Sequence, residues 1–177
     1  MLDGTTRACE TCPAGYICAS TGMTVPTPCG KGFYSADGEA TACSTCDLGH
    51  YCERDDTSDT MMTANTCGAG YQCVAGTSER PFADHEDQWG ISDKYSCPPG
   101  NWCENGVATA CLKGTYNSLY GADAIEDCLV TPTGFYTDVD GSDDFITQQC
   151  GQGHYCPAGT SDFTTEICPK GTFRRTL

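Results

Sequence analysis

The apolar residues of this chain never recur at the i, i+3, i+4, i+7 spacing of an amphipathic helix over a useful window. We therefore expect little or no helix. What recurs instead is a short phrase, Cys-x-x-Gly, which is usually followed within two residues by an aromatic side chain. This pattern predicts a mostly irregular fold in which glycine turns and short strands replace long elements.

The phrase occurs eight times, and a ninth copy around Gly134 lacks the leading cysteine. We call each copy a repeat and its glycine the key glycine. The key glycines are Gly15, Gly32, Gly49, Gly70, Gly100, Gly114, Gly134, Gly153 and Gly171. A near-periodic series of this kind is typical of tandem repeats. We expect each key glycine to adopt a backbone conformation closed to other residues, and the following ring to lie against a neighbouring disulfide or ring.

Two kinds of repeat follow from the cysteine spacing. The short kind closes as Cys-x5-Cys, in the pairs Cys12/Cys18, Cys46/Cys52, Cys67/Cys73, Cys97/Cys103 and Cys150/Cys156. The long kind runs through a polar turn to a distant cysteine, as Asp37-Gly38 leads to Cys43 and Asp140-Gly141 leads to Cys150. Asp-Gly favours a type I′ turn, in which both central residues have φ > 0. The long kind therefore predicts a short two-stranded hairpin.

Composition indicates how such a chain can be stable. Leu, Ile, Val and Phe number 22 of 177 residues, a fraction typical of disorder, whereas 16 cysteines are typical of a disulfide scaffold. Cross-links therefore replace an apolar core, which argues against a large α/β enzyme or a helical bundle. We expect an extracellular or cell-surface protein. The alternative, a reduced metal protein, would use Cys9-x2-Cys12 and Cys43-x2-Cys46 as halves of a zinc site, but the repeat offers no consistent set of four ligands.

The net charge of −15, from 24 acidic and 9 basic residues, disfavours nucleic acid as a partner. No apolar run approaches the length of a transmembrane span, and no secretion signal is visible. We expect either that a signal was removed or that the chain is a piece of a longer one. The segment Thr24-Val25-Pro26-Thr27-Pro28 suits O-glycosylation, so a glycoprotein is expected.

Candidate sites are few. Asp138, Asp140 and Asp143 are candidate Ca²⁺ ligands around Gly141, against the alternative of a solvated hairpin turn. Phe82 and Trp89, in an acidic insertion over residues 74–96, are candidate contact residues for a partner. His50 and His154 share one repeat position, which indicates a structural role. No catalytic motif is present, so we expect no enzyme and no cofactor other than calcium.

The segment from Cys29 to Cys46 (CGKGFYSADGEATACSTC) resembles the ephrin-receptor-like cysteine-rich repeat, and Cys12–Cys18 resembles its short companion. That repeat is similar to the first half-module of tumour-necrosis-factor-receptor cysteine-rich domains. The resemblance covers most of residues 9–177 and departs most at 53–66 and 74–96. It implies an extracellular, elongated, disulfide-rich array of small hairpins stacked end to end. It also implies a Cys29–Cys43 bond.

When the sixteen cysteines are grouped by their place in the repeat, they define four cysteine-rich modules. These modules cover residues 9–45, 46–96, 97–149 and, in part, 150–177. Cys9 then closes a preceding repeat, and Cys168 opens one that the chain does not close. We therefore expect either a fragment of a longer repeat protein or a head-to-tail array in which Cys168 of one copy pairs with Cys9 of the next. In the alternative, Cys128 pairs with Cys150 and all sixteen cysteines close internally.

The sequence thus favours an extracellular structural protein, a disulfide-stapled repeat rod that assembles into a surface fibre, coat or appendage. Its partners would be copies of itself or neighbouring repeats, and other surface or matrix proteins in an adhesive role. The alternative is a ligand- or matrix-binding segment of a receptor ectodomain, with Phe82 and Trp89 as anchors. Filaments in the native material would support the first, and a discrete particle the second.

Overall fold

The structure of the chain is a computed structural model that describes residues 9–36, 41–53, 65–81 and 95–173. Its strands are two to four residues long. They are β1 (Tyr16–Ile17), β2 (Thr27–Pro28), β3 (Phe33–Tyr34), β4 (Ser44–Thr45), β5 (His50–Tyr51), β6 (Asn65–Thr66), β7 (Asn101–Glu104), β8 (Val107–Ala110), β9 (Thr115–Tyr116) and β10 (Leu129–Val130). Two 3-10 turns, η1 (Ile125–Asp127) and η2 (Phe163–Thr165), are the only helical elements of the described residues.

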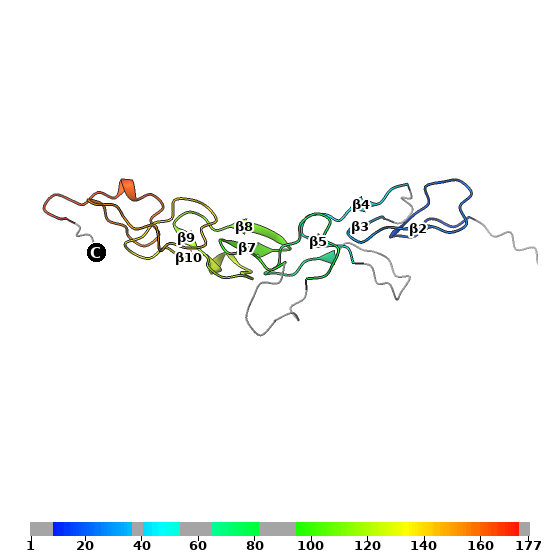
Figure 1. Cartoon of the computed structure of the whole chain (residues 1–177), viewed down its shortest axis with the longest axis horizontal. Coiled ribbons are helices and arrows are strands. Elements are labelled where there is room, and N and C mark those ends of the chain that lie inside the picture. The colour runs from blue at the N-terminus through cyan, green and yellow to red at the C-terminus, as the bar shows by residue number, and fades with distance from the viewer. Residues whose placement is uncertain (1–8, 37–40, 54–64, 82–94, 174–177) are drawn as a thin grey trace, which may run out of the picture. The chain divides into compact units, whose positions relative to one another are not determined.

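The strands form five two-stranded sheets, β1–β2, β3–β4, β5–β6, β7–β8 and β9–β10 (Figure 1). The hairpin predicted for the long repeat is confirmed at β3 and β4, where Phe33 is paired with Thr45 in antiparallel register. In the Gly134 repeat it is reduced to one bridge, between Phe135 and Gln149. The fold is therefore small, disulfide-rich and mostly irregular, as the sequence predicts.

The most regular hairpin joins β7 to β8 through the two residues Asn105 and Gly106 (Figure 1). Their φ angles are 51° and 77°, which is the pair of positive values that a type I′ turn needs. Asn tolerates this conformation better than most residues with a Cβ, and glycine adopts it freely. The tight turn fixes the register of β7 against β8 and holds Cys103 in a strand.

The type I′ turn predicted at Asp140-Gly141 is wrong. Asn105 is the only non-glycine residue with positive φ in the described part of the chain, so Asp140 does not take the required conformation. The reason is a tertiary contact, since the N–H of Gly141 donates to the carbonyl of Cys111 at 2.7 Å. The Asp140 carboxylate accepts from the N–H of Lys113 at 2.9 Å. The other predicted turn, Asp37-Gly38, lies outside the described residues.

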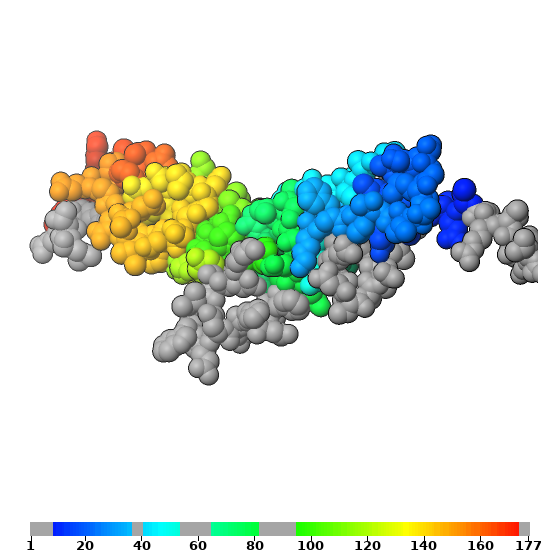
Figure 2. All heavy atoms as spheres, turned by 45° about the vertical axis from the view of Figure 1, so that its right-hand side comes forward, coloured from blue at the N-terminus to red at the C-terminus, as the bar shows by residue number. Residues whose placement is uncertain are grey.

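The chain divides into two compact units. The first is drawn from residues 1–65 and 75–80, and the second from residues 66–74 and 81–177. Within the second unit, consecutive repeats lie side by side in chain order, which the passage from green through yellow to orange makes visible (Figure 2). Each repeat therefore has the next repeat as its neighbour in space.

Cysteine forms the core. Every buried apolar residue that the structure describes is a cysteine or an alanine, and Cys46, Cys52, Cys73, Cys97 and Cys103 are fully buried. Large apolar side chains such as Leu112, Leu119 and Ile146 are more than half exposed. Ring pairs add satellite packing, as where the edge of Phe145 meets Tyr116 at 4.7 Å and Phe135 at 5.0 Å between centroids. Cystine takes the place that aliphatic side chains hold in ordinary domains.

Candidate functional site

Seven disulfides connect fourteen of the sixteen cysteines. All five short-kind pairs are bonded as predicted, namely Cys12–Cys18, Cys46–Cys52, Cys67–Cys73, Cys97–Cys103 and Cys150–Cys156. The long-kind bonds are Cys29–Cys43, which the family resemblance implies, and Cys111–Cys128. The alternative pairing of Cys128 with Cys150 is therefore wrong. Every disulfide closes within one repeat.

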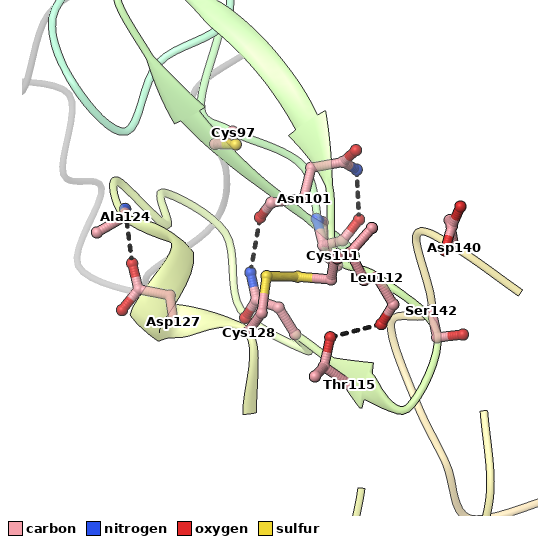
Figure 3. Close-up of a disulfide and its surroundings, with 12 residues drawn as sticks. Cys97, Asn101, Cys111, Leu112, Thr115, Ala124, Asp127, Cys128, Asp140 and Ser142 are labelled. Atoms are coloured by element: carbon pink, nitrogen blue, oxygen red, sulfur yellow. Dashed lines mark hydrogen bonds between the residues drawn. A yellow bond between two sulfur atoms is a disulfide. The ribbon is translucent and has the colours of Figure 1, made fainter. Parts of the chain in front are cut away.

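The Cys111–Cys128 bond shows how a long repeat is closed (Figure 3). The Asp127 carboxylate accepts from the N–H of Ala124 at 3.2 Å and thereby holds the η1 turn that precedes Cys128. On the other side, the Thr115 hydroxyl donates to the carbonyl of Leu112 at 2.6 Å. Local polar contacts thus hold the backbone on both sides of the Cys111–Cys128 bond, and no apolar core is needed to place the two sulfur atoms.

All nine key glycines have φ between 77° and 92°, which confirms the predicted backbone conformation. Residues with a Cβ rarely adopt this left-handed region. The repeats share this backbone conformation at the key glycine, although their side chains differ. We call the residue three before each key glycine the opening residue; it is cysteine in every repeat but the one around Gly134, where it is Thr131.

A backbone ladder joins each repeat to the next. In its first bond, the N–H of an opening residue donates to the carbonyl of the preceding key glycine. This bond occurs at seven junctions, from Cys29 to Gly15, Cys46 to Gly32, Cys97 to Gly70, Cys111 to Gly100, Thr131 to Gly114, Cys150 to Gly134 and Cys168 to Gly153, at 2.8–3.0 Å. The same bond therefore forms whether or not the opening residue is a cysteine.

The second bond runs in the opposite direction. The N–H of a key glycine donates to the carbonyl of the residue three beyond the next key glycine. The pairs are Gly15 to Ser35, Gly32 to Cys52, Gly70 to Cys103, Gly100 to Asn117, Gly114 to Thr137 and Gly134 to Cys156, at 2.7–3.1 Å. Each key glycine that makes both bonds therefore has its donor and its acceptor satisfied by the following repeat.

A third bond uses a further glycine, six or seven residues beyond the key glycine, which we call the second glycine. Its N–H donates to the carbonyl of the preceding opening residue. This occurs from Gly76 to Cys46, Gly121 to Cys97, Gly141 to Cys111 and Gly159 to Thr131, at 2.7–2.9 Å. All three hydrogen bonds are present at the junctions Gly100–Gly114, Gly114–Gly134 and Gly134–Gly153, and the other junctions show one or two of them among the described residues.

The second glycine also reaches the repeat before the preceding one. A Cβ placed on Gly32 would lie 2.5 Å from the carbonyl oxygen of Gly76, and one on Gly114 would lie 2.5 Å from that of Gly159. The pairs Gly70 with Gly121 and Gly100 with Gly141 meet in the same way. Real Cβ atoms do not approach a backbone oxygen so closely. The key glycine is therefore required both by its φ and by this contact.

The Gly134 repeat replaces a disulfide with a hydrogen bond. Thr131 and Thr137 stand at the two positions that cysteines occupy in a short repeat, and both are completely buried. Their hydroxyl oxygens lie 2.9 Å apart, and the Thr137 oxygen also accepts from the N–H of Gly114 at 2.8 Å. Buried hydroxyls need such partners. The threonine pair keeps the repeat closed where no cystine is present.

This equivalence gives a direct prediction. The double variant Thr131→Cys/Thr137→Cys is expected to form an eighth disulfide when the protein is oxidised, because a cystine fits the same two positions in five other repeats. Loop closure of this size contributes about 2 kcal/mol to the free energy of unfolding. Intact mass and thiol counting measure the bond. In the control, Thr133→Cys/Thr137→Cys, position 133 is exposed and the two new thiols stay free in addition to those of Cys9 and Cys168. Two thiols more than in the unmodified chain, if found in the first variant, would contradict the equivalence.

The polar residues three beyond a key glycine share a second role. The Ser35 hydroxyl donates to the carbonyl of Tyr16 at 2.8 Å, and the Asn117 amide donates to that of Asn101 at 2.9 Å. The Thr137 hydroxyl makes the same contact with Thr115 at 3.3 Å. Each of these side chains therefore satisfies a carbonyl of the preceding repeat and strengthens the junction.

Cys9 and Cys168 are free thiols, as the reading by register predicts. Cys9 is exposed and Cys168 is half-buried. Zinc binding through Cys9-x2-Cys12 and Cys43-x2-Cys46 is not possible in this oxidised form, because three of those four sulfurs are in disulfides. Cys9 and Cys168 are thus the two cysteines that take part in no disulfide of the described residues.

The three candidate calcium ligands are not brought together. Within the described ranges, no three or more His, Cys, Asp or Glu side chains could hold a metal ion. Asp138 instead accepts from the Gln148 amide at 3.4 Å, and Asp140 accepts from the N–H of Lys113. The carboxylates cap local backbone and side-chain donors, so the calcium interpretation of Asp138, Asp140 and Asp143 is not supported.

His50 and His154 make the same contact, as their shared position predicts. Each Nδ1 lies near the carbonyl two residues back, on Leu48 at 3.2 Å and on Gln152 at 3.0 Å. The Asn101 amide occupies the same place in its repeat and donates to Pro99 at 3.0 Å. Each contact is made to the carbonyl of the same local turn, which is a structural use of histidine.

Two surface groups have shifted pKa values. Hydrogen bonds from Thr164 hold the pKa of the Asp162 carboxyl below its usual value, and this carboxylate caps η2. A hydrogen bond with Glu166 raises the pKa of Tyr155. Both side chains are exposed, so these shifts describe local turns. The candidate contact residues Phe82 and Trp89 lie outside the described residues.

The chain matches no protein-family model, and no curated protein is similar to it. In the described residues, no helix has the length and apolar character needed to cross a membrane. The density of disulfides fits an extracellular or secreted protein. The repeat junction is the contact that recurs most regularly along the described chain. It is therefore the candidate functional site.

Proposed function

We propose that this chain belongs to an extracellular structural protein whose tandem cysteine-rich repeats assemble into a surface fibre, coat or appendage. The observation that supports the proposal is the recurrence of one junction, with the same bonds to the carbonyl and N–H of successive key glycines. A binding module needs one recognition surface, whereas a structural array needs the same contact many times. The resemblance to ephrin-receptor-like repeats supports an extracellular setting.

The disulfides and the backbone ladder have different roles in the proposed structural array. Each disulfide closes a loop within one repeat and restricts its unfolded state, typically by about 2–4 kcal/mol. The ladder then couples each closed loop to the next through backbone groups, so the same junction forms whether the opening residue is cysteine or threonine. Force applied along such a chain is shared over many short, cross-linked loops.

Negative-stain electron microscopy of the native material tests this function. We expect filaments or a regular coat, because equivalent junctions extend without an end when their rotation does not close. Treatment with a reductant is the control, and it should disperse the assemblies. A discrete, monodisperse particle in the native material would contradict the proposal and would favour a receptor ectodomain segment.

A further inference from the structure

We propose that the free edge of β8 binds an extended, positively charged peptide segment of a partner protein, which adds to the β7–β8 hairpin as a third strand. The inference goes beyond the proposed structural function, because it assigns a side surface of one repeat and not the contact between consecutive repeats. It follows from backbone groups of β8 that no described neighbour uses, and from the carboxylates that lie beside them.

The β7–β8 hairpin alternates between residue pairs that bond across it and pairs whose backbone groups face outward. Its two-residue turn makes the pair that flanks the turn a hydrogen-bonded pair. The pairs alternate from there, so Cys103 opposite Ala108 and Asn101 opposite Ala110 do not bond across the hairpin. The N–H and carbonyl groups of these four residues therefore point away from it, two residues on each edge.

The outward groups of β7 are used by neighbouring repeats. The N–H of Cys103 donates to the carbonyl of Ala122 at 3.0 Å, and the Cys103 carbonyl accepts from the N–H of Gly70 at 3.0 Å. The Asn101 carbonyl accepts from the Asn117 amide at 2.9 Å. The β7 edge of the hairpin is therefore closed to a further strand.

The outward groups of β8 have no such partners. Among the residues that the structure describes, neither the N–H nor the carbonyl of Ala108 or Ala110 takes part in a hydrogen bond. Two residues separate them along the strand, which is the spacing at which an added antiparallel strand bonds. Proteins commonly protect an edge with charged side chains or proline, and β8 has neither. Its edge is thus suited to strand addition.

The length of β8 distinguishes it from the other strands. In the described chain, β7 and β8 have four residues each and the other strands have two. Since outward residues alternate with inward ones, a two-residue strand offers one donor and one acceptor at most. With β7 closed, β8 is the strand that offers two of each. Its Val107 and Thr109 side chains are exposed, and β-branched residues of this kind favour cross-strand pairing.

Carboxylates lie at both ends of β8. At the turn end, the exposed Glu104 is directly opposite Val107. At the other end, a Cβ placed on Gly141 would lie 3.7 Å from that of Ala110, so the turn around Gly141 lies beside the strand. The exposed carboxylates of this turn are those of Asp138, Asp140, Asp143 and Asp144.

This charge determines which kind of partner fits. From Glu104 to Asp144 the chain has eight acidic residues and a single basic one, Lys113. A second copy of the chain, with its net charge of −15, would bring like charges together at the edge. A segment with lysine or arginine would instead meet opposite charges while its backbone bonds to Ala108 and Ala110. The occupant that the surface favours is therefore a basic, extended segment.

A defined peptide tests the proposal. The probe is Lys-Thr-Val-Thr-Val-Lys, acetylated and amidated, titrated into the oxidised full chain at low ionic strength and followed by amide NMR spectra. We expect saturable binding with a Kd of about 1 mM, and the largest shifts at the amides of Ala108 and Ala110. The Cys103 amide, already bonded on the closed edge, should shift least. No saturable shift at Ala108 and Ala110 up to about 10 mM peptide would overturn the proposal.

Two matched peptides separate the backbone from the charge. In the first, all four central amides carry N-methyl groups, which keep both lysines but remove the donors, and it should not bind. In the second, glutamate replaces both lysines on an unchanged backbone, and it should bind at least about tenfold more weakly. Binding of the methylated peptide would exclude strand addition, and equal binding of the glutamate peptide would exclude a basic partner.

Two variants of one residue test the edge itself. Ala108→Pro removes an outward N–H without removing a bond between β7 and β8, because proline is tolerated on an edge strand at such a position. It should weaken binding of the lysine peptide about tenfold or more. Ala108→Val keeps the N–H and should bind within about twofold of the parent. The Cys97–Cys103 peptide in a disulfide map shows that each variant has folded; equal affinities would contradict the proposal.

Other occupants of the edge give different results. Slow hydrogen exchange at Ala108 and Ala110 before peptide is added would mean that the edge is already covered, by a second copy if the protection rises with protein concentration and by the chain itself if it does not. Either result would overturn the proposal. Filaments in the native material without peptide binding would leave the structural function standing.

Discussion

Reduction of the seven disulfides is expected to unfold the chain at room temperature. The buried apolar residues that the structure describes are only cysteines and alanines, so no aliphatic core remains once the sulfurs separate. Each disulfide typically contributes about 2–4 kcal/mol, whereas a whole domain is stable by about 5–15 kcal/mol. Loss of several disulfides therefore exceeds the total. Hydrogen exchange and circular dichroism, before and after reduction and alkylation, measure the effect.

A variant without one disulfide is the graded control for this experiment. Cys150→Ser/Cys156→Ser removes a single pair in the second compact unit. It should increase exchange at amides that depend on the Gly153 repeat, such as that of Cys168, which donates to the Gly153 carbonyl. It should leave the amides of Cys29 and Cys46 in the first unit protected. A fully reduced chain that kept its protected amides would show that something other than cystine holds the fold.

Substitution of a key glycine has the second largest expected effect. Gly114→Ala should lower the free energy of unfolding by about 2–5 kcal/mol. About 1–2 kcal/mol comes from placing a Cβ at left-handed φ, and a further about 1–3 kcal/mol comes from overpacking. The φ of Gly114 is 87°, and its Cβ would lie 2.5 Å from the carbonyl oxygen of Gly159. Denaturant unfolding of the oxidised protein, monitored by Trp102 fluorescence, measures the loss.

Gly121→Ala, in the same repeat, separates the two causes. Its φ of 77° imposes the same conformational cost, but no atom lies within 4 Å of the added Cβ. It should therefore lower the free energy of unfolding by only about 1–2 kcal/mol. Equal losses for the two variants would mean that the contact between alternate repeats does not contribute, and the second glycine would lose its assigned role.

The cysteine pairing was predictable because it is local. Every bonded pair lies within one repeat, and the recurrence of Cys-x5-Cys determined five of the seven bonds. The absence of α-helix followed from the missing helical period. By contrast, the threonine pair Thr131/Thr137 was not identified as a substitute for cystine. Its six-residue separation equals that of the short disulfides, and this was the signal that could have revealed it.

The turns were predicted less well. Asn105-Gly106 carries one of the strongest short-range hairpin signals and forms the most regular hairpin in the described chain, whereas the type I′ turn predicted at Asp140-Gly141 does not form. Asp140-Gly141 fails as a type I′ turn because Gly141 is committed to the carbonyl of Cys111. A turn whose glycine serves a tertiary contact does not follow the statistics of isolated hairpins.

The hydrogen bonds of the repeat junction could not be predicted from the sequence. Its bonds join residues of consecutive repeats whose key glycines lie 14 to 30 residues apart. The closest contacts even join alternate repeats, as between Gly32 and Gly76. Backbone groups make these contacts, and backbone groups leave no side-chain pattern. Only the second glycines, recurring six or seven residues beyond the key ones, mark them in the sequence.

Disulfide mapping of the oxidised full-length chain by mass spectrometry tests the central claim most directly. If every cystine closes its own repeat and no disulfide joins neighbouring repeats, the peptides will show the seven bonds described above. Cys9 and Cys168 will take part in none of these bonds. A bond that crosses from one closed repeat to another within the chain, such as Cys128–Cys150, would contradict the account.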